Sequence, residues 1–236
     1  MQCVILAGGL GTRLSGVSGS VPKTLMPVGG RPFAEHQLMW LANGGITEVV
    51  YCIGYGGGQI RSHVGEGQRF GLDISYVDEG SQLRGTGGAL RLALEEGVLQ
   101  ESFFVLYGDS LLDLNLRDVR NRYRASECAG LMTVYRNGGQ FARSNAAFDG
   151  AVVTYDKRNP TADMEWIDYG LMVLSHAAIA GVAPDTVVDL CDVLKDLSDR
   201  GDLAGFEAEV RFFEIGTPEA LAELEDAMTE ARKPRR

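Results

Sequence analysis

Short apolar runs alternate with helical patterns of apolar residues through the first half of the chain. Runs rich in valine, isoleucine and aromatic residues predict strands at 3–7, 48–53, 73–77, 103–107 and 130–135. The apolar spacing between them predicts helices at 33–43, 59–64, 88–96 and 116–125. Strands that alternate with helices are typical of βαβ units. The pattern therefore predicts an α/β fold with a mostly parallel sheet flanked by helices.

The second half of the chain has a less regular pattern. It predicts strands at 151–155, 166–174 and 210–215 and an amphipathic helix at 187–199. Thr217-Pro218-Glu219 combines an N-cap, a proline suited to the first helical position and an early carboxylate, so a last helix should run to about residue 231. Since no linker, low-complexity run or internal repeat divides the sequence, we expect a single domain.

Composition and charge exclude several classes of protein. The 236 residues are 45% hydrophobic and 23% charged, as in compact globular proteins. A formal net charge of -10 argues against binding of nucleic acid through its phosphates, and the basic tail at 232–236 is expected to be solvated. The N-terminus lacks the cationic start of a signal peptide, and no apolar stretch approaches membrane-spanning length. The scattered cysteines Cys3, Cys52, Cys128 and Cys191 suit reduced thiols. We expect a cytoplasmic protein without nucleic-acid or membrane partners.

A glycine-rich segment follows the first predicted strand, where α/β sheets bind phosphates. Glycine lets backbone N–H groups approach an anion without an intervening Cβ. The run Gly8-Gly9-Leu10-Gly11-Thr12-Arg13 lacks the third glycine of a dinucleotide fingerprint, and no Gly-Lys-Ser/Thr of a P-loop follows. Arg13 and the later Lys23 bracket the loop with two cations, which favours a triphosphate ligand. A glycine turn used only for tight packing is the alternative.

Several motifs together resemble those of the sugar-1-phosphate nucleotidyltransferases, also called NDP-sugar pyrophosphorylases. The match begins with residues 4–13 and, after eight intervening residues, Pro22-Lys23. Gly85-Thr86-Gly87-Gly88-Ala89 resembles the family's second glycine loop and Gly108-Asp109 its metal-binding aspartate. Asp156-Lys157 resembles its sugar-phosphate pair and Gly216-Thr217-Pro218-Glu219 its last motif. The matches keep the family's order over about residues 3 to 225 and look most like the D-glycero-alpha-D-manno-heptose 1-phosphate guanylyltransferase branch.

The resemblance implies a fold and a reaction. The fold is the nucleotide-diphospho-sugar transferase fold: a three-layer, Rossmann-like, mixed and mostly parallel sheet. It would form one domain, 1–236, with a nucleotide-binding half at about 1–110 and a sugar-phosphate-binding half at about 111–225. The reaction transfers a nucleoside monophosphate from an NTP to a sugar 1-phosphate, giving an NDP-sugar and pyrophosphate, with Mg²⁺ as cofactor. By analogy, the product would serve capsule or glycoconjugate assembly.

Substrate identity and oligomeric state are less constrained by the sequence. GTP and D-glycero-alpha-D-manno-heptose 1-phosphate are the first expectation. Mannose 1-phosphate with GTP, or UTP, CTP or dTTP with another sugar phosphate, are alternatives within the class. A non-catalytic regulatory subunit that binds nucleotide sugars is the alternative outside it. A homo-oligomer is compatible with the sequence, which does not specify the assembly.

This chemistry fits a chain without a catalytic His or Cys constellation. A phosphate monoester has a second pKa of about 6, so the nucleophile is already an anion and needs no general base. Catalysis then consists of positioning and charge neutralisation. By the resemblance, Arg13 would hold the β- and γ-phosphates, Lys23 would lie beside the α-phosphate, and Asp109 would bind the metal.

Glu214 stands where the resembled pattern usually has a second metal-binding aspartate. Its carboxylate reaches one methylene farther, whereas Mg²⁺ tolerates little deviation from its oxygen distances. There are three interpretations: the strand of Glu214 lies farther from the metal, a water lies between the carboxylate and the metal, or metal binding is impaired.

The remaining expected contacts divide between nucleotide and sugar phosphate. The nucleotide is expected on Leu6, Ala7, Gly8, Gly9, Gly11, Thr12, Arg13, Lys23, Glu79, Gly85, Thr86 and Gly108. Glu79 can accept two hydrogen bonds from guanine N1 and N2, and an exposed loop acid is the alternative. The sugar phosphate is expected on Asn145, Asp156, Lys157, Asp168, Tyr169 and Gly170. Asp156 replaces a common glutamate and Asp168 a common asparagine, which leaves the sugar open.

Overall fold

A mixed sheet of nine strands forms the centre of the protein, whose computed structural model describes residues 1–9 and 21–231. Four strands are mutually parallel in the order β6-β1-β4-β5, with bounds β1 (Cys3–Leu6), β4 (Glu48–Ile53), β5 (Asp73–Asp78) and β6 (Ser102–Tyr107). The long strand β11 (Trp166–Ser175) runs antiparallel to β6 and to β8 (Gly130–Arg136). Strand β12 (Leu203–Ala208) lies parallel to β8, and the hairpin β9 (Ala146–Phe148) and β10 (Val153–Tyr155) completes the sheet.

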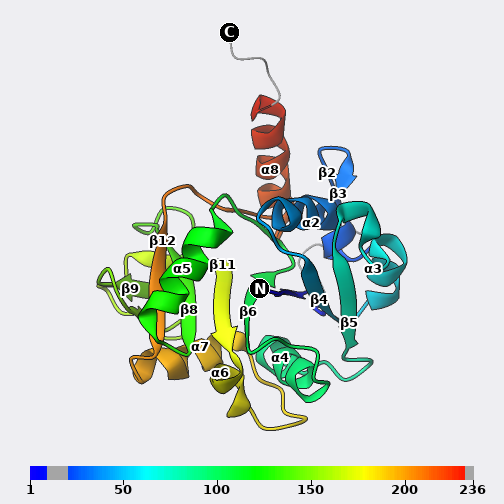
Figure 1. The fold of residues 1–236 in the computed structure, drawn as a ribbon. Helices are drawn as coiled ribbons and strands as arrows, with labels where there is room; N and C mark the ends of the chain where they lie inside the picture. Colours follow the sequence, from blue (N-terminus) through cyan, green and yellow to red (C-terminus); the bar gives the residue numbers. More distant parts are fainter. Residues whose placement is uncertain (10–20, 232–236) are drawn as a thin grey trace.

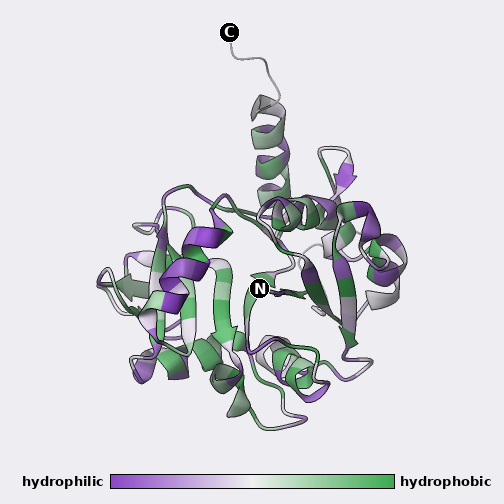
Figure 2. Cartoon of the chain, viewed as in Figure 1, coloured by the Kyte–Doolittle hydropathy of each residue, from purple (hydrophilic) through white to green (hydrophobic). Residues whose placement is uncertain are grey.

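Helices cover both faces of this sheet (Figure 1). One face packs against α2 (Phe33–Asn43), α3 (Gly57–Val64) and α5 (Leu116–Ser126). The other packs against α4 (Gly85–Glu95), α6 (His176–Ala180) and α7 (Leu190–Asp199). The strands are apolar and the outer surface of α5 is polar, as Figure 2 shows. The expected three-layer, mostly parallel α/β architecture is therefore confirmed.

Smaller elements surround this framework. The pairs β2 (Pro27–Val28) with β3 (Arg31–Pro32) and β7 (Ser110–Leu111) with β13 (Phe213–Glu214) are antiparallel. The 3-10 turns are η2 (Lys23–Leu25) and η3 (Gln68–Phe70). Helix α8 (Pro218–Ala231) extends away from the body, and its first turns pack on residues of β2 and α2. All four cysteines are free, and no helix among the described residues is long and apolar enough to cross a bilayer.

Some predicted boundaries were wrong. Strand β12 was not predicted because small residues weaken its apolar pattern: a Cβ on Gly205 would lie 2.2 Å from the Phe148 ring, so this position needs glycine. Helix α7 begins at Leu190 rather than 187, and the predicted strand 210–215 contracts to Phe213–Glu214. The second glycine loop is the first turn of α4, which begins at Gly85 and not at residue 88.

Candidate functional site

A cavity of about 410 Å³ opens at the carboxyl ends of β1 and β6. This edge of a parallel sheet is where α/β proteins bind ligands. The lining residues are Leu6, Ala7, Gly8, Gly9, Pro22, Lys23, Thr24, Cys52, Glu79, Leu83, Gly85, Thr86, Ala89, Tyr107, Gly108, Asp109, Asp189 and Gly216. All the predicted nucleotide-binding residues that the structure describes line this cavity. Gly11, Thr12 and Arg13 lie outside the described residues.

At two of the lining glycines, a side chain would clash with a neighbouring residue. A Cβ on Gly8 would lie 2.4 Å from Oε1 of Glu79, and one on Gly108 would lie 2.7 Å from the Leu6 carbonyl oxygen. Among residues 1–9 and 21–231, a Cβ on Gly9 would meet no atom within 4 Å. Gly8 and Gly108 therefore keep the cavity walls close together, whereas Gly9 leaves open space for a ligand.

Lys23 and Asp109 meet at one end of the cavity. Lys23 lies in η2 and Asp109 in the turn between β6 and β7, and the Lys23 Nζ to Asp109 Oδ2 distance is 2.5 Å. Their side chains are only 16% and 28% exposed. This mostly buried pair places a cation and an anion in the lining of the cavity, where charged groups of a ligand could bind.

Glu214 is exposed and does not line the cavity, but the pairing of β13 with β7 places it next to the Asp109 turn. Glu214 pairs with Ser110, and the N–H of Ile215 donates to the Asp109 carbonyl oxygen at 3.0 Å. The Glu214 carboxylate folds back toward Gly216, where a Cβ would lie 3.3 Å from Oε1. The carboxylate of Asp109, from the β6–β7 turn, and that of Glu214, from the adjacent strand β13, offer the hard oxygen donors that Mg²⁺ takes, so their chemistry fits a divalent cation.

Glu79 is buried in the cavity wall and is only 7% exposed, so it is not an exposed loop acid. Its Oε2 accepts a hydrogen bond from the Arg84 backbone N–H at 2.6 Å. Burial raises the pKa of Glu79, and the hydrogen bond from Arg84 partly opposes that rise. Oε1 is the oxygen beside Gly8, on the side where the first glycine segment lines the cavity.

The amide groups at the start of α4 are already used within the chain. The N–H groups of Gly87 and Gly88 donate to the Val188 carbonyl oxygen at 2.8 and 3.1 Å. The Thr86 hydroxyl accepts from the Leu190 N–H at 2.7 Å, and Gly85 has a φ of +72° with no room for a Cβ against Val188. Gly87 and Gly88 therefore hold the segment before α7 in place and do not bind an anion.

The predicted sugar-phosphate residues Asn145, Asp168 and Gly170 form one hydrogen-bonded group beside the cavity. The Asp168 N–H donates to Asn145 Oδ1 at 3.1 Å, and Asp168 Oδ1 accepts from the Gly170 N–H at 2.9 Å. The hydroxyl of Tyr107, a residue that lines the cavity, donates to Asp168 Oδ2 at 3.3 Å. Burial raises the pKa of Asp168 to about 6, while Gly170, Lys157 and Tyr107 lower it.

The other three predicted sugar-phosphate residues lie in different surroundings. Asp156 Oδ1 accepts from the N–H groups of Arg158 and Asn159 at 3.0 and 2.7 Å, so one of its oxygens stabilises a turn. Lys157 is exposed. The Tyr169 ring is fully buried in the core on the opposite face of the sheet, 5.4 Å from the Phe212 ring centroid. The structure does not bring the Tyr169 side chain to the cavity.

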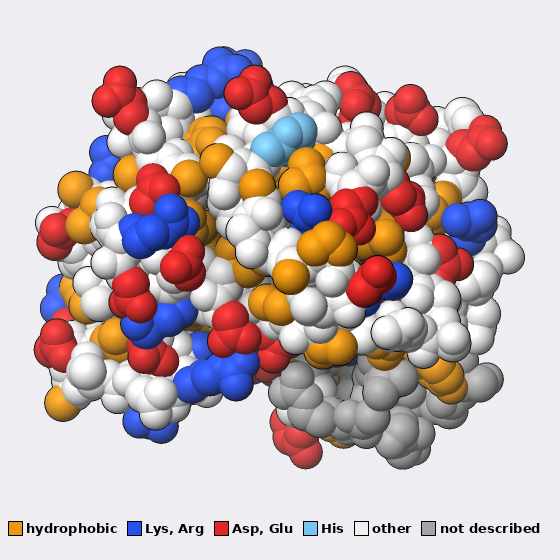
Figure 3. Space-filling model, turned by 90° about the horizontal axis from the view of Figure 1, so that it is seen from below, with side chains coloured by type: hydrophobic (Ala, Val, Ile, Leu, Met, Phe, Trp, Pro, Cys, Tyr) orange, Lys and Arg blue, Asp and Glu red, His pale blue; other side chains and the backbone are white. Residues whose placement is uncertain are grey.

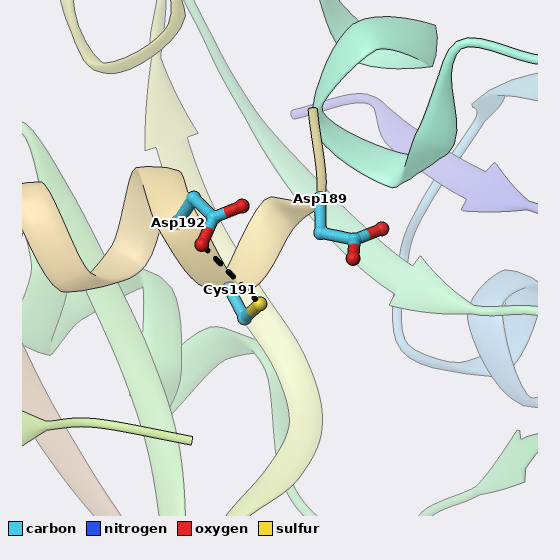
Figure 4. A group of neighbouring side chains, drawn as sticks. All are labelled: Asp189, Cys191 and Asp192. Atoms are coloured by element: carbon cyan, nitrogen blue, oxygen red, sulfur yellow. Dashed lines mark hydrogen bonds between the residues drawn. The ribbon is translucent and has the colours of Figure 1, made fainter. Parts of the chain in front are cut away.

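The sequence did not single out Tyr107 or Asp189, which also line the cavity. Asp189 is the N-cap of α7 but makes no side-chain capping hydrogen bond. Figure 4 shows it beside Cys191 and Asp192: one ligand atom of each of these three residues lies within 4.8 Å of the other two, and Cys191 Sγ contacts Asp192 at 3.9 Å. Arg158 lies 2.7 Å from Asp192 and 3.9 Å from Asp189. An aspartate directly before a helix predicts a cap, so only the structure shows that Asp189 faces the cavity.

The surface around α4, α6 and α7 carries charges of both signs. Figure 3 shows basic and acidic side chains interspersed on this face, with apolar side chains between them. Nucleic-acid binding relies on clustered Lys and Arg. The face in view offers no such cluster among the described residues.

Comparison with known proteins gives a family match. The family described as "Nucleotidyl transferase" matches residues 2–143, which is more than half of the chain. The glucose-1-phosphate thymidylyltransferase of Streptomyces antibioticus is 27% identical over 245 residues, covering 100% of this chain and 68% of that protein. The D-glycero-alpha-D-manno-heptose 1-phosphate guanylyltransferase of Aneurinibacillus thermoaerophilus is 32% identical over 158 residues, covering 67% of this chain and 65% of that protein.

A solved structure also shares the fold. The putative glucose-1-phosphate thymidylyltransferase from Bacillus anthracis superposes with a TM-score of 0.83 at 21% identity, covering 100% of this chain and 98% of that one. At this identity the likeness shows the fold alone. It confirms the expected nucleotide-diphospho-sugar transferase fold.

Proposed function

The chain belongs to the nucleotidyl transferase family, and we propose that it transfers GMP from GTP to D-glycero-alpha-D-manno-heptose 1-phosphate, giving GDP-heptose and pyrophosphate. The sugar-1-phosphate nucleotidyltransferase class is common to both relatives, which are named for different nucleobases and sugars. The observation that carries the proposal is the Lys23–Asp109 pair in a glycine-lined cavity at the ends of two parallel strands.

The proposed roles follow from the positions of the charges. An oxygen of the sugar 1-phosphate attacks the α-phosphorus of GTP, and the bond from that phosphorus to the bridging oxygen breaks to release pyrophosphate. Lys23 lies beside the α-phosphate and stabilises the charge that develops there. Arg13, which belongs to the same segment of the chain, holds the β- and γ-phosphates. The half-buried setting of Lys23 strengthens this effect because water screens it less.

Asp109 and Glu214 are proposed to hold Mg²⁺. When bound, the metal neutralises charge on the phosphates of the nucleotide. In this structure the Lys23 ammonium lies against Asp109 Oδ2, so the proposed metal ligand and the cation proposed for the α-phosphate are neighbours. The backbone pairing of β13 with β7 brings Glu214 next to the Asp109 turn, which supports its role despite the longer side chain.

Guanine is proposed as the base because a buried carboxylate faces the cavity. Glu79 Oε1 lies beside Gly8, and guanine offers two donors, N1–H and the N2 amino group, to a carboxylate. The same carboxylate meets no donor pair of this kind on uracil, cytosine or thymine. Glu79→Gln should therefore reduce the preference for GTP over the other nucleotides, because the amide presents a donor to guanine.

The sugar is proposed to lie between Asp168 and Asp189. A carboxylate can accept hydrogen bonds from hydroxyl groups, so these two side chains suit a neutral, hydroxyl-rich sugar such as a heptose or mannose. Lys157 is proposed to meet the phosphate of the sugar. A cytoplasmic setting and a role in capsule or glycoconjugate assembly stay predictions.

A panel of substrates tests the proposal. Pyrophosphate release is measured for GTP, UTP, CTP and dTTP against heptose 1-phosphate, mannose 1-phosphate and glucose 1-phosphate, with Asp109→Ala as the inactive control. We expect the fastest release from GTP with heptose 1-phosphate. No release from any pair, together with stabilisation of the protein by nucleotide, would instead support a regulatory subunit that binds nucleotide sugars.

A further inference from the structure

A buried glutamine of α2 is hydrogen-bonded to the backbone of the turn that carries Asp109. Gln37 has no exposed surface. Its Nε2 donates to the carbonyl oxygens of Tyr107 at 2.9 Å and Ser110 at 2.8 Å. Tyr107 ends β6 and Ser110 begins β7, so the two acceptors stand on either side of Gly108-Asp109. One side-chain nitrogen thus joins both ends of the turn.

The chemistry of these contacts fixes the orientation of the amide. Both neighbours are carbonyl oxygens, which only accept, so the NH₂ group and not the oxygen must face them. Gln37 Oε1 is buried and has no hydrogen-bond partner among the described residues. Leaving a buried acceptor unpaired is unfavourable, and an apolar side chain of similar size would avoid it. What the amide of Gln37 adds over an apolar side chain is therefore its two hydrogen bonds to the turn.

The same helix supports the other charged residue of the site. The Phe33 N–H at the start of α2 donates to the Met26 carbonyl oxygen at 2.9 Å, and the Met26 N–H donates to the Lys23 carbonyl oxygen at 3.0 Å. Helix α2 is thus hydrogen-bonded both to the η2 turn of Lys23 and to the turn of Asp109. A rigid element that contacts both turns sets their separation.

We propose that Gln37 is a positioning residue that fixes the Gly108-Asp109 turn and so directs the Asp109 carboxylate toward Lys23 and the divalent cation. Gln37 does not touch the substrate, and its effect passes through the backbone of the turn. The proposal rests on the metal-binding role proposed for Asp109. Groups that orient metal ligands typically change metal affinity or activity by about 10- to 100-fold when they are lost.

The test compares two buried side chains that donate hydrogen bonds to backbone carbonyl oxygens. Gln37→Met keeps the side-chain volume and removes both contacts to the turn. Thr133→Val is the matched control, because the Thr133 hydroxyl is also fully buried and donates to a backbone carbonyl, that of Leu171 at 2.7 Å, away from the lining of the cavity. Gln37→Glu, which has the same shape and can donate one hydrogen bond only when protonated, serves if the methionine variant does not fold.

Mn²⁺ serves as the probe, and the free ion is followed by electron paramagnetic resonance with and without GTP. We expect Mn²⁺ affinity and turnover of Gln37→Met to fall by about 10-fold or more, while the KM for the sugar 1-phosphate stays at the wild-type value. Thr133→Val should retain both. For Gln37→Glu, affinity should fall as the pH rises and the carboxyl loses its proton.

Two results would overturn the proposal: wild-type Mn²⁺ affinity in a folded Gln37 variant, or an equal loss in Thr133→Val. If the wild-type protein binds Mn²⁺ but releases no pyrophosphate from any substrate pair, the proposed function fails while the comparison at Gln37 still stands.

Discussion

Replacing Asp168 by asparagine should stabilise the folded protein at neutral pH. Burial raises the pKa of Asp168 from 3.8 to about 6, against the lowering effects of the Gly170 N–H, the Lys157 ammonium and the Tyr107 hydroxyl. Asparagine keeps the shape and the oxygen that accepts from Gly170, and its amide group can donate to the Tyr107 hydroxyl. The substitution therefore removes a buried charge without opening a cavity.

The raised pKa of Asp168 sets both the sign and the pH window of this effect. Between 3.8 and about 6, the folded state binds more protons at this carboxyl than the unfolded state does, so the contribution to stability falls as the pH rises. Above this window, the raised pKa lowers the free energy of unfolding by ~3 kcal/mol relative to a carboxyl whose pKa does not change on folding, at 1.36 kcal/mol per pKa unit. Because the side chain retains some contact with water, we expect ~1–3 kcal/mol. Near pH 4 this destabilisation by Asp168 should be only about 0.5 kcal/mol.

Urea unfolding of wild type and Asp168→Asn at about pH 8 and about pH 4 measures the difference. We expect the variant to gain ~1–3 kcal/mol at the higher pH and little at the lower one. Asp163→Asn is the control, because a hydrogen bond from the Thr161 hydroxyl lowers the pKa of this exposed carboxyl, and its removal should bring no gain. An unchanged stability of Asp168→Asn near pH 8, or a gain that grows toward acid, would refute the reasoning.

Further predictions concern the nucleotide side of the cavity. Lys23→Ala should lower kcat by about 10²- to 10³-fold with a smaller change in nucleotide KM, because the ammonium acts on charge that develops in the transition state, and steady-state kinetics separate the two. An unchanged kcat would remove this role. Gly8→Ala should weaken GTP binding by calorimetry and destabilise the protein by ~1–3 kcal/mol, since the new Cβ meets Glu79 Oε1. The Cβ of Gly9→Ala meets no atom of the described part of the chain within 4 Å, so this variant should not be destabilised; an equal loss of stability would contradict the steric explanation.

The parallel half of the fold could be predicted from the sequence because its strands are continuous apolar runs. Strands buried on both faces have this pattern. Strand β12 could not be found in this way, since Gly205 is required by the Phe148 ring and not by local preference. The start of α7 was placed too early because Val188 is apolar, yet its carbonyl oxygen accepts the N–H groups of Gly87 and Gly88 in the first turn of α4. Long-range contacts decided both cases.

In the candidate site, too, some residues could be identified from local motifs and others only from long-range contacts. The glycines and Lys23 belong to short motifs that the sequence displays directly, and the structure brings Lys23 to Asp109, which is 86 positions away. Tyr169 neighbours Asp168 in the predicted sugar set, but adjacent residues of a strand point to opposite faces, and its ring is in the core. Gln37 carries no motif at all. Its role follows from the contact between α2 and the β6–β7 turn, which no local pattern encodes.

The hydrogen bonds from Gly87 and Gly88 to Val188 limit how this protein can be rearranged. Residues 188–190 come from the half of the chain expected to bind the sugar, yet they complete the first turn of a helix in the nucleotide half. A fragment that ends near residue 110 would leave those two amides unpaired and β6 without its neighbour β11. An exchange of sugar specificity between relatives would therefore have to keep residues 185–190 with the nucleotide half. We therefore expect the two halves to fold as one unit and not to act as interchangeable modules.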